Sequence, residues 1–245
     1  VAVDRILHHD DVAAVSFVGS TPIAKYIYET GTKNGKRVQA LGGAKNHMLV
    51  LADADLDMAV ACALDGSFFS TGQRCTASSR LIVTRGIHDA FVDRLGTAAA
   101  ALRVGDARDP QSQMGPVVSQ HQLERNLDYL DIGRSEGATV TGGTRLEIGR
   151  GTFMEPALLT GASNEMRVCR EEIFGPVASV IQVDDYDQAL AVANDTEFGL
   201  SAGICTSSLA HATDFRRRAE AGMVMVNLPT AGVDYHVPFG GRKGS

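Results

Sequence analysis

Short runs of apolar residues alternate along the chain with longer stretches in which apolar residues recur every three or four positions. Apolar runs flanked by turn residues are typical of buried strands, and the periodic stretches are typical of amphipathic helices. Strands are therefore predicted at residues 12–18, 48–51, 81–84, 177–183, 202–206 and 223–227. Helices are predicted over residues 22–30, 56–67, 88–102, 119–136 and 208–221, with one more capped near Asp187. This alternation predicts an α/β fold with a mostly parallel sheet.

Two glycine-containing turns interrupt the pattern in the first part of the chain. Gly19 and Ser20 follow the first predicted strand, and Pro22 suits the first turn of the next helix. A strand, a glycine turn and a helix together place backbone amides where they can bind phosphate, although many α/β proteins contain such a turn without a ligand. Gly42 and Gly43 permit either a close approach of the backbone to a ligand or a sharp crossing between layers.

Composition excludes several classes of protein. The chain has 245 residues, of which 44% are hydrophobic and 21% charged, enough to form one large domain or two ordinary ones. The net charge of −6 and the scattered lysines and arginines argue against nucleic-acid binding. No apolar run reaches the roughly 18–20 residues of a membrane span, and the N-terminus lacks the apolar core of a signal peptide. We therefore expect a soluble, cytoplasmic protein without nucleic-acid or membrane partners.

The cysteines show no CxxC pair and no regular framework, which indicates free thiols in a reducing compartment. They are Cys62, Cys75, Cys169 and Cys205. A zinc site is not expected, because the one close histidine pair, His8 and His9, would point its side chains in different directions. We therefore expect no metal.

Cys75 is the strongest candidate for chemistry. It lies in a glycine-containing turn between a predicted helix and a predicted strand, directly after Arg74. An adjacent cation favours the thiolate, which is the nucleophilic form of cysteine. The alternative is that Cys75 is a small buried apolar residue, as most free cysteines are. The local residues alone leave both interpretations open.

Five motifs occur in a defined order at residues 17–21, 41–43, 72–75, 171–176 and 238–241. Their sequences are Phe-Val-Gly-Ser-Thr, Leu-Gly-Gly, Gly-Gln-Arg-Cys, Glu-Glu-Ile-Phe-Gly-Pro and Pro-Phe-Gly-Gly. Together they resemble the signatures of the NAD(P)-dependent aldehyde dehydrogenase superfamily, and the resemblance covers the whole chain. It implies the tail of a Rossmann-like cofactor domain at residues 1–42 and most of the catalytic domain at 43–245. Because members of that superfamily are longer, we expect the chain to be truncated at both ends.

The resemblance implies roles for particular residues. Cys75 would attack the aldehyde carbon and form a thioester after hydride transfer to the nicotinamide of NAD or NADP. Glu172 would hold the nicotinamide ribose, and Phe174 would pack against the nicotinamide. Gly19 and Ser20 would lie near the pyrophosphate of the cofactor.

The other cofactor contacts implied by the resemblance are Leu41 and Gly42. The residue before this Leu-Gly-Gly motif is Ala40, where hydrolytic members carry a glutamate as general base. Because alanine cannot transfer a proton, cleavage of the thioester by water or by coenzyme A both stay open. The whole protein is expected to form a homo-oligomer, either a dimer or a tetramer.

Two resemblances within the superfamily concern the aldehyde. Residues 40–47 look like the methylmalonate-semialdehyde dehydrogenase branch, which transfers its acyl group to coenzyme A. Residues 68–80 and 221–245 are similar to the 2,5-dioxovalerate (α-ketoglutaric semialdehyde) dehydrogenases. Both branches take a small aldehyde that bears a carboxylate.

Arg74 is the expected partner of that carboxylate, because guanidinium binds carboxylate bidentately. Phe69 is the second expected substrate contact. Arg74 has two alternative roles, which are lowering the Cys75 pKa and forming a surface salt bridge. A further possibility is a catalytically inactive fragment used for structure or interaction, and we expect this chain alone to lack dehydrogenase activity.

Overall fold

The computed structural model describes residues 2–232 and 234–245; Val1 and Val233, which belong to the predicted segments 1–42 and 221–245, lie outside the described residues. In the described part, a seven-stranded sheet has the order β12-β11-β3-β4-β9-β8-β5, and every neighbouring pair is parallel except β8 and β5. The strands are β3 (Asn46–Val50), β4 (Ser78–Thr84), β5 (Thr139–Gly142), β8 (Ala157–Ala162), β9 (Val177–Val183), β11 (Ser201–Cys205) and β12 (Met223–Val226). The predicted α/β fold with a mostly parallel sheet is confirmed.

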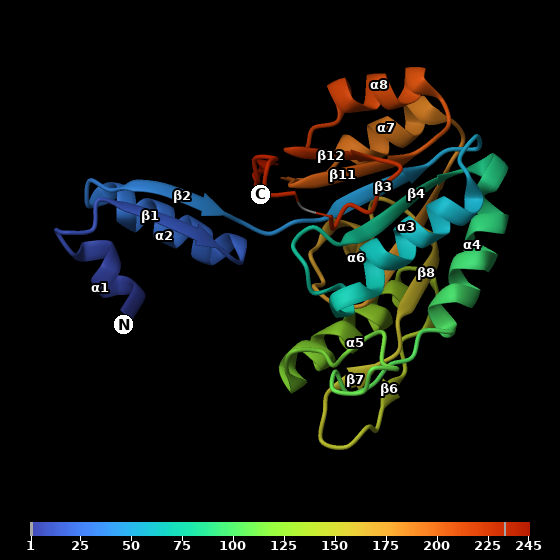
Figure 1. The fold of residues 1–245 in the computed structure, drawn as a ribbon, viewed down its shortest axis with the longest axis horizontal. Helices are drawn as coiled ribbons and strands as arrows, with labels where there is room; N and C mark the ends of the chain where they lie inside the picture. Colours follow the sequence, from blue (N-terminus) through green and yellow to red (C-terminus); the bar gives the residue numbers. More distant parts are fainter. Residues whose placement is uncertain (1, 233) are drawn as a thin grey trace.

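Helices cover both faces of this sheet (Figure 1). They are α3 (Leu56–Phe68) and α4 (Arg85–Ala100) on one face, and α5 (Gln120–Ser135), α6 (Arg167–Arg170), α7 (Tyr186–Asn194) and α8 (Leu209–Arg218) on the other. Along β3, Met48 and Val50 pack with the first pair of helices, whereas Leu49 packs with the second group. Because both faces are covered, central strands such as β3 and β11 are buried at every position rather than at alternate ones.

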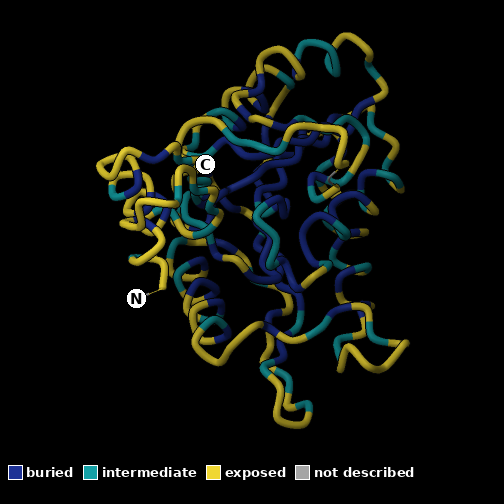
Figure 2. Tube along the Cα trace, turned by 60° about the vertical axis from the view of Figure 1, so that its left-hand side comes forward, coloured by how far each residue is buried: buried dark blue, intermediate teal, exposed yellow. Residues whose placement is uncertain are grey.

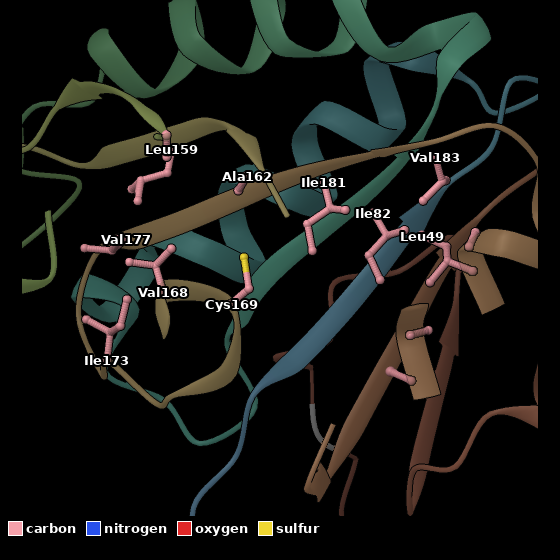
Figure 3. Packing of buried hydrophobic residues seen from close by; sticks show 14 of the residues in the cluster. Leu49, Ile82, Leu159, Ala162, Val168, Cys169, Ile173, Val177, Ile181 and Val183 are labelled. Atoms are coloured by element: carbon pink, nitrogen blue, oxygen red, sulfur yellow. The ribbon is translucent and has the colours of Figure 1, made fainter. Parts of the chain in front are cut away.

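The larger of the two cores lies on the face of the second helix group. Figure 3 shows Leu49, Ile82 and Ile181, which come from three neighbouring strands of the sheet. The thiol of Cys169, from α6, lies among these apolar side chains and is fully buried. None of the helices in the described residues is both long and apolar enough to cross a membrane.

A smaller unit precedes the large sheet and lies beside it (Figure 1). It consists of α1 (Ala2–His8), β1 (Ala14–Val18), α2 (Thr21–Lys33) and β2 (Arg37–Leu41), with β1 and β2 parallel. The strand predicted at residues 12–18 forms, but the prediction that it is buried is wrong: Val18 is 55% exposed. The reason is that α2 packs on only one face of this two-stranded sheet, and Figure 2 shows exposed positions throughout the unit.

Gly42 and Gly43 lie in the segment that connects the small unit to β3, and we call this pair the two-glycine crossing. The Gly43 N–H donates to Thr21 Oγ1 at 2.9 Å, which ties the crossing to the first residue of α2. Ser245 Oγ donates to the Gly43 carbonyl at 2.8 Å, so the C-terminal segment returns to the same place. A short antiparallel pair, β10 (Phe198–Gly199) and β13 (Arg242–Lys243), holds that segment.

The helix predicted to be capped near Asp187 is α7 (Tyr186–Asn194), and its cap lies two residues earlier. The cap of α7 is Asp185, whose side chain accepts from the Gln188 N–H at 2.9 Å; Asp187 lies inside the first turn. The short helices α1 and α6 were not predicted, because one or two turns are too short for a periodic pattern to show. A hairpin of β6 (Arg145–Leu146) and β7 (Phe153–Met154) also forms.

Candidate active site

The segment before Cys75 reverses direction in a tight turn. This turn, η1 (Phe69–Gly72), has left-handed backbone at Ser70, Thr71 and Gly72. Gly72 has a φ of 61°, and a Cβ atom there would lie 2.1 Å from the Gly175 carbonyl oxygen. Only glycine therefore fits, and the Cys75 segment packs directly against the segment that follows Glu172.

A cleft of about 710 Å³ joins this turn to the small N-terminal unit, a volume typical of small-molecule sites. It brings together seven of the nine predicted site residues. These are Gly19, Ser20, Gly42, Arg74, Cys75, Glu172 and Phe174. Segments that are far apart in the sequence thus meet at the half-buried Cys75.

Phe69 is not brought to this cleft. Its ring packs against the apolar cluster between the sheet and the helices α3 and α4. The left-handed turn that begins at this residue carries the chain away toward Cys75 and leaves the phenylalanine ring in the core. Leu41 does not line the cleft either, but it pairs in register with Val18, which does.

Ala40 does not face Cys75. Side chains alternate between the two faces of a strand, so Ala40 and Leu41 point to opposite sides of β2. Ala40 lines a separate groove against α2, beside Tyr28, whereas Leu41 shares the face of Val18. The expectation that residue 40 is the position from which a base would act on a Cys75 thioester is therefore wrong, because its side chain packs against α2.

The guanidinium of Arg74 is paired with Asp65 of α3. Its Nη2 donates to the Asp65 carbonyl and lies 3.3 Å from Asp65 Oδ1, so the guanidinium is bound to α3. Burial raises the pKa of the Cys75 thiol, and the carboxylate of Glu172 raises it further, while the Cys75 and Thr76 amides lower it. The expectation that the adjacent cation favours the thiolate is wrong, because Arg74 is paired with Asp65 instead.

The carboxylate of Glu172 lies against the two-glycine crossing. Its Oε1 accepts from the Ala44 N–H at 3.1 Å, and its Oε2 would lie 2.6 Å from a Cβ atom on Gly43. Burial raises the pKa of Glu172, and the Ala44 N–H and the charges of Lys45 and Arg125 oppose that rise. Glu172 thus presents a carboxylate to the cleft at the junction of the two units.

The whole chain matches the model of one protein family, described as "Aldehyde dehydrogenase family", over residues 1–245. The chain belongs to the aldehyde dehydrogenase family. It is 45% identical over 235 residues to an alpha-ketoglutarate semialdehyde dehydrogenase of Haloferax volcanii, covering 94% of this chain and 48% of that protein. The chain thus spans about half the length of the curated relatives that it matches.

Solved aldehyde dehydrogenases share the fold. A methylmalonate-semialdehyde dehydrogenase from Oceanimonas doudoroffii has a TM-score of 0.95 and 40% identity, and the match covers 100% of this chain and 51% of that one. A 1-pyrroline-5-carboxylate dehydrogenase from Thermus, solved with bound NAD, has a TM-score of 0.91 and 37% identity, covering 97% and 47%.

This aldehyde dehydrogenase chain also holds its Glu172 segment with residues that the motifs did not reveal. Arg125 Nη2 donates to the Glu172 carbonyl at 2.9 Å. Gln122 Nε2 donates to the Ile173 carbonyl at 2.7 Å and to that of Phe174 at 3.2 Å. Both residues line the cleft. Their only signal in the sequence is the three-residue spacing that places two polar side chains on one side of a helix.

The cleft has features that fit a dinucleotide cofactor. Ser20, which lines the cleft, is the N-cap of α2, but its side chain makes no capping hydrogen bond to the first amides of the helix. A helix N-terminus of this kind attracts phosphate groups. The half-buried Glu172 carboxylate can accept hydrogen bonds from ribose hydroxyls. Within the described ranges, no three His, Cys, Asp or Glu side chains are grouped so that they could hold a metal ion.

Proposed function

We propose that the protein containing this chain is an NAD(P)-dependent dehydrogenase that oxidises α-ketoglutaric semialdehyde to the acid through a thioester on Cys75. The observation that carries the proposal is the single cleft in which Cys75 meets Glu172 and the Gly19–Ser20 turn. The name and the 45% identity of the Haloferax relative support the substrate. The structure of the Thermus relative with NAD supports a nicotinamide cofactor.

We further propose that residues 1–42 belong to the cofactor domain and residues 43–245 to the catalytic domain. The separate two-stranded sheet of the first part supports this division, with the crossing at Gly42 and Gly43 as its boundary. In this arrangement Gly19 and Ser20 bind the cofactor pyrophosphate, and Glu172 binds the nicotinamide ribose. A homo-oligomeric whole protein stays a prediction.

The proposed chemistry is carried by the sulfur of Cys75. The thiolate adds to the aldehyde carbon and forms a tetrahedral thiohemiacetal. When bound, the nicotinamide supplies a hydride acceptor. Cys75 then carries an acyl group as a thioester, which either water or the thiol of coenzyme A releases.

The second candidate is a coenzyme A-acylating methylmalonate-semialdehyde dehydrogenase. The solved Oceanimonas enzyme with that name, at a TM-score of 0.95, favours it. A second supporting observation is Leu41, which occupies the cleft side of β2 and cannot act as a base toward a deacylating water.

The two candidates differ in the product, which decides between them. Full-length protein is incubated with NAD or NADP and each semialdehyde, with and without coenzyme A, and the products are identified by mass spectrometry. We expect the free acid to form from α-ketoglutaric semialdehyde without coenzyme A. If no free acid forms without coenzyme A, and the coenzyme A ester forms once coenzyme A is added, this assignment is overturned in favour of the second candidate.

Cys75→Ser in the same protein is the control, and it should abolish turnover with either aldehyde. If the folded, full-length protein reduces neither NAD nor NADP with either aldehyde, both candidates are overturned. The 245-residue chain alone should show no turnover-linked NAD(P)H absorbance.

A further inference from the structure

Four consecutive backbone carbonyls, beginning at the nucleophile, are each held by a buried side chain. Asn46 Nδ2 donates to Cys75 O at 2.7 Å and to Ala77 O at 3.0 Å, Thr230 Oγ1 donates to Thr76 O at 2.8 Å, and Ser67 Oγ donates to Ser78 O at 2.6 Å. Side chains from β3, α3 and the C-terminal part of the chain therefore orient the peptide planes after Cys75. Asn46 supplies two of these bonds, and Ser201 Oγ also donates to Thr76 O at 3.5 Å.

Asn46 is an unusual residue for its position. It begins a strand of the central sheet and is only 3% exposed. Its Oδ1 accepts a third hydrogen bond, from the Ser201 N–H at 3.0 Å. The pairing of β3 with β4 shifts in register directly after Asn46, so regular backbone pairing is interrupted where Cys75 and Ala77 approach. A buried amide is costly unless it is hydrogen-bonded, and here the bonds go to the nucleophile segment.

The bond to the Cys75 carbonyl has a geometric consequence. In a trans peptide, the carbonyl of Cys75 and the N–H of Thr76 lie in one plane and point in opposite directions. Because Asn46 holds the carbonyl, the Thr76 N–H is directed away from Asn46. The N–H groups of Thr76 and Cys75 both lower the pKa of the Cys75 thiol, so the orientation of this peptide plane bears on the sulfur.

We propose that Asn46 is a positioning residue for Cys75: by holding the Cys75 carbonyl it fixes the peptide plane between Cys75 and Thr76, and with it the direction of the Thr76 N–H relative to the sulfur. The proposal rests on the proposed function in taking Cys75 as the nucleophile. Its effect, however, is on the sulfur itself and can be measured without turnover.

The charged groups around Cys75 are separate from this contact. The carboxylate of Glu172 disfavours the thiolate. Arg125 lines the same cleft and donates to the backbone of Glu172, and Arg74 is bound to Asp65. An Asn46 substitution leaves all of these charged groups in place, so they do not account for a change in thiol titration.

The test is the rate of alkylation of Cys75 by iodoacetamide as a function of pH, measured on the 245-residue chain with the modified site identified by mass spectrometry. We expect Asn46→Ala to raise the pH midpoint by about one unit, which slows alkylation about tenfold at pH values below the midpoint. The other three cysteines are buried, so Cys75 is the accessible thiol.

Thr230→Val is the matched control. It removes a buried donor to the next carbonyl, that of Thr76. The N–H in that peptide plane belongs to Ala77 and donates to the Arg74 carbonyl at 3.0 Å, not to the sulfur. We therefore expect Thr230→Val to lower the thermal unfolding midpoint without moving the alkylation midpoint.

An alkylation midpoint equal to the parent's in folded Asn46→Ala overturns the proposal, and so does an equal shift in Thr230→Val. If the alanine variant does not fold, Asn46→Ser, which keeps a hydroxyl group in the strand, is measured in its place by the same criterion. A full-length protein without dehydrogenase activity would refute the proposed function, whereas the alkylation midpoints test the role of Asn46 independently.

Discussion

Replacing Gly72 with alanine tests the close packing of the two segments that form the site. The backbone of Gly72 is left-handed, with a φ of 61°, and this costs an L-residue about 1–2 kcal/mol. The new Cβ atom would also lie 2.1 Å from the Gly175 oxygen, and such overpacking costs about 1–3 kcal/mol. Gly72→Ala should therefore reduce the free energy of unfolding by about 2–5 kcal/mol.

For a chain of this size, each kcal/mol lowers the thermal midpoint by about 2–4 °C, so we expect a decrease of about 4–20 °C in circular dichroism melts. Gly96→Ala is the matched control. Gly96 lies inside α4, where a Cβ atom would meet nothing within 4 Å. Alanine favours a helix over glycine by about 0.5–1 kcal/mol, so this variant should melt slightly higher than the parent. A Gly72→Ala midpoint at or above the parent's would refute the argument.

Three further predictions concern the chemistry of the cleft. In full-length protein without coenzyme A, Leu41→Glu should speed acid formation by about 100-fold or more, because it places a base on the cleft side of β2. Ala40→Glu should not speed acid formation, and equal rates for the two variants would contradict the orientation of β2. Because the carboxylate of Glu172 raises the pKa of Cys75, Glu172→Gln should lower the pH midpoint for alkylation of the thiol; an upward shift would contradict this. Arg74→Gln should raise KM for the semialdehyde by about tenfold or more if Arg74 binds its carboxylate; an unchanged KM with a lower melting temperature would leave the pair with Asp65 as its role.

Much of the fold could be predicted because local pattern and tertiary environment agree. The strand at residues 177–183 is mostly apolar, and the structure places it inside the sheet with helices on both sides. The strand at residues 12–18 has a similar apolar pattern, yet its sheet has a helix on one face only. An apolar run indicates a strand, but its burial depends on layers that other parts of a molecule provide.

The residues that form the site could be predicted better than the contacts that those residues make. The motif residues Cys75 and Glu172 do meet in one cleft. The direction of Arg74 was not predictable, because it depends on Asp65, nine residues earlier on α3. Gln122 lies in no motif, and Asn46 lies in the segment 40–47 without an assigned role; their partners are 51 and 29 residues away, so only the folded chain reveals these contacts.

The crossing at Gly42 and Gly43 connects the two sheets that form the walls of the cleft. One wall, with Gly19 and Ser20, belongs to the small sheet, and the wall with Cys75 belongs to the large one. The bond from the Gly43 N–H to Thr21 ties this connection to the small unit. A ligand that contacts both the turn at Gly19 and Cys75 therefore bridges two separate sheets, and its affinity depends on how the two are placed.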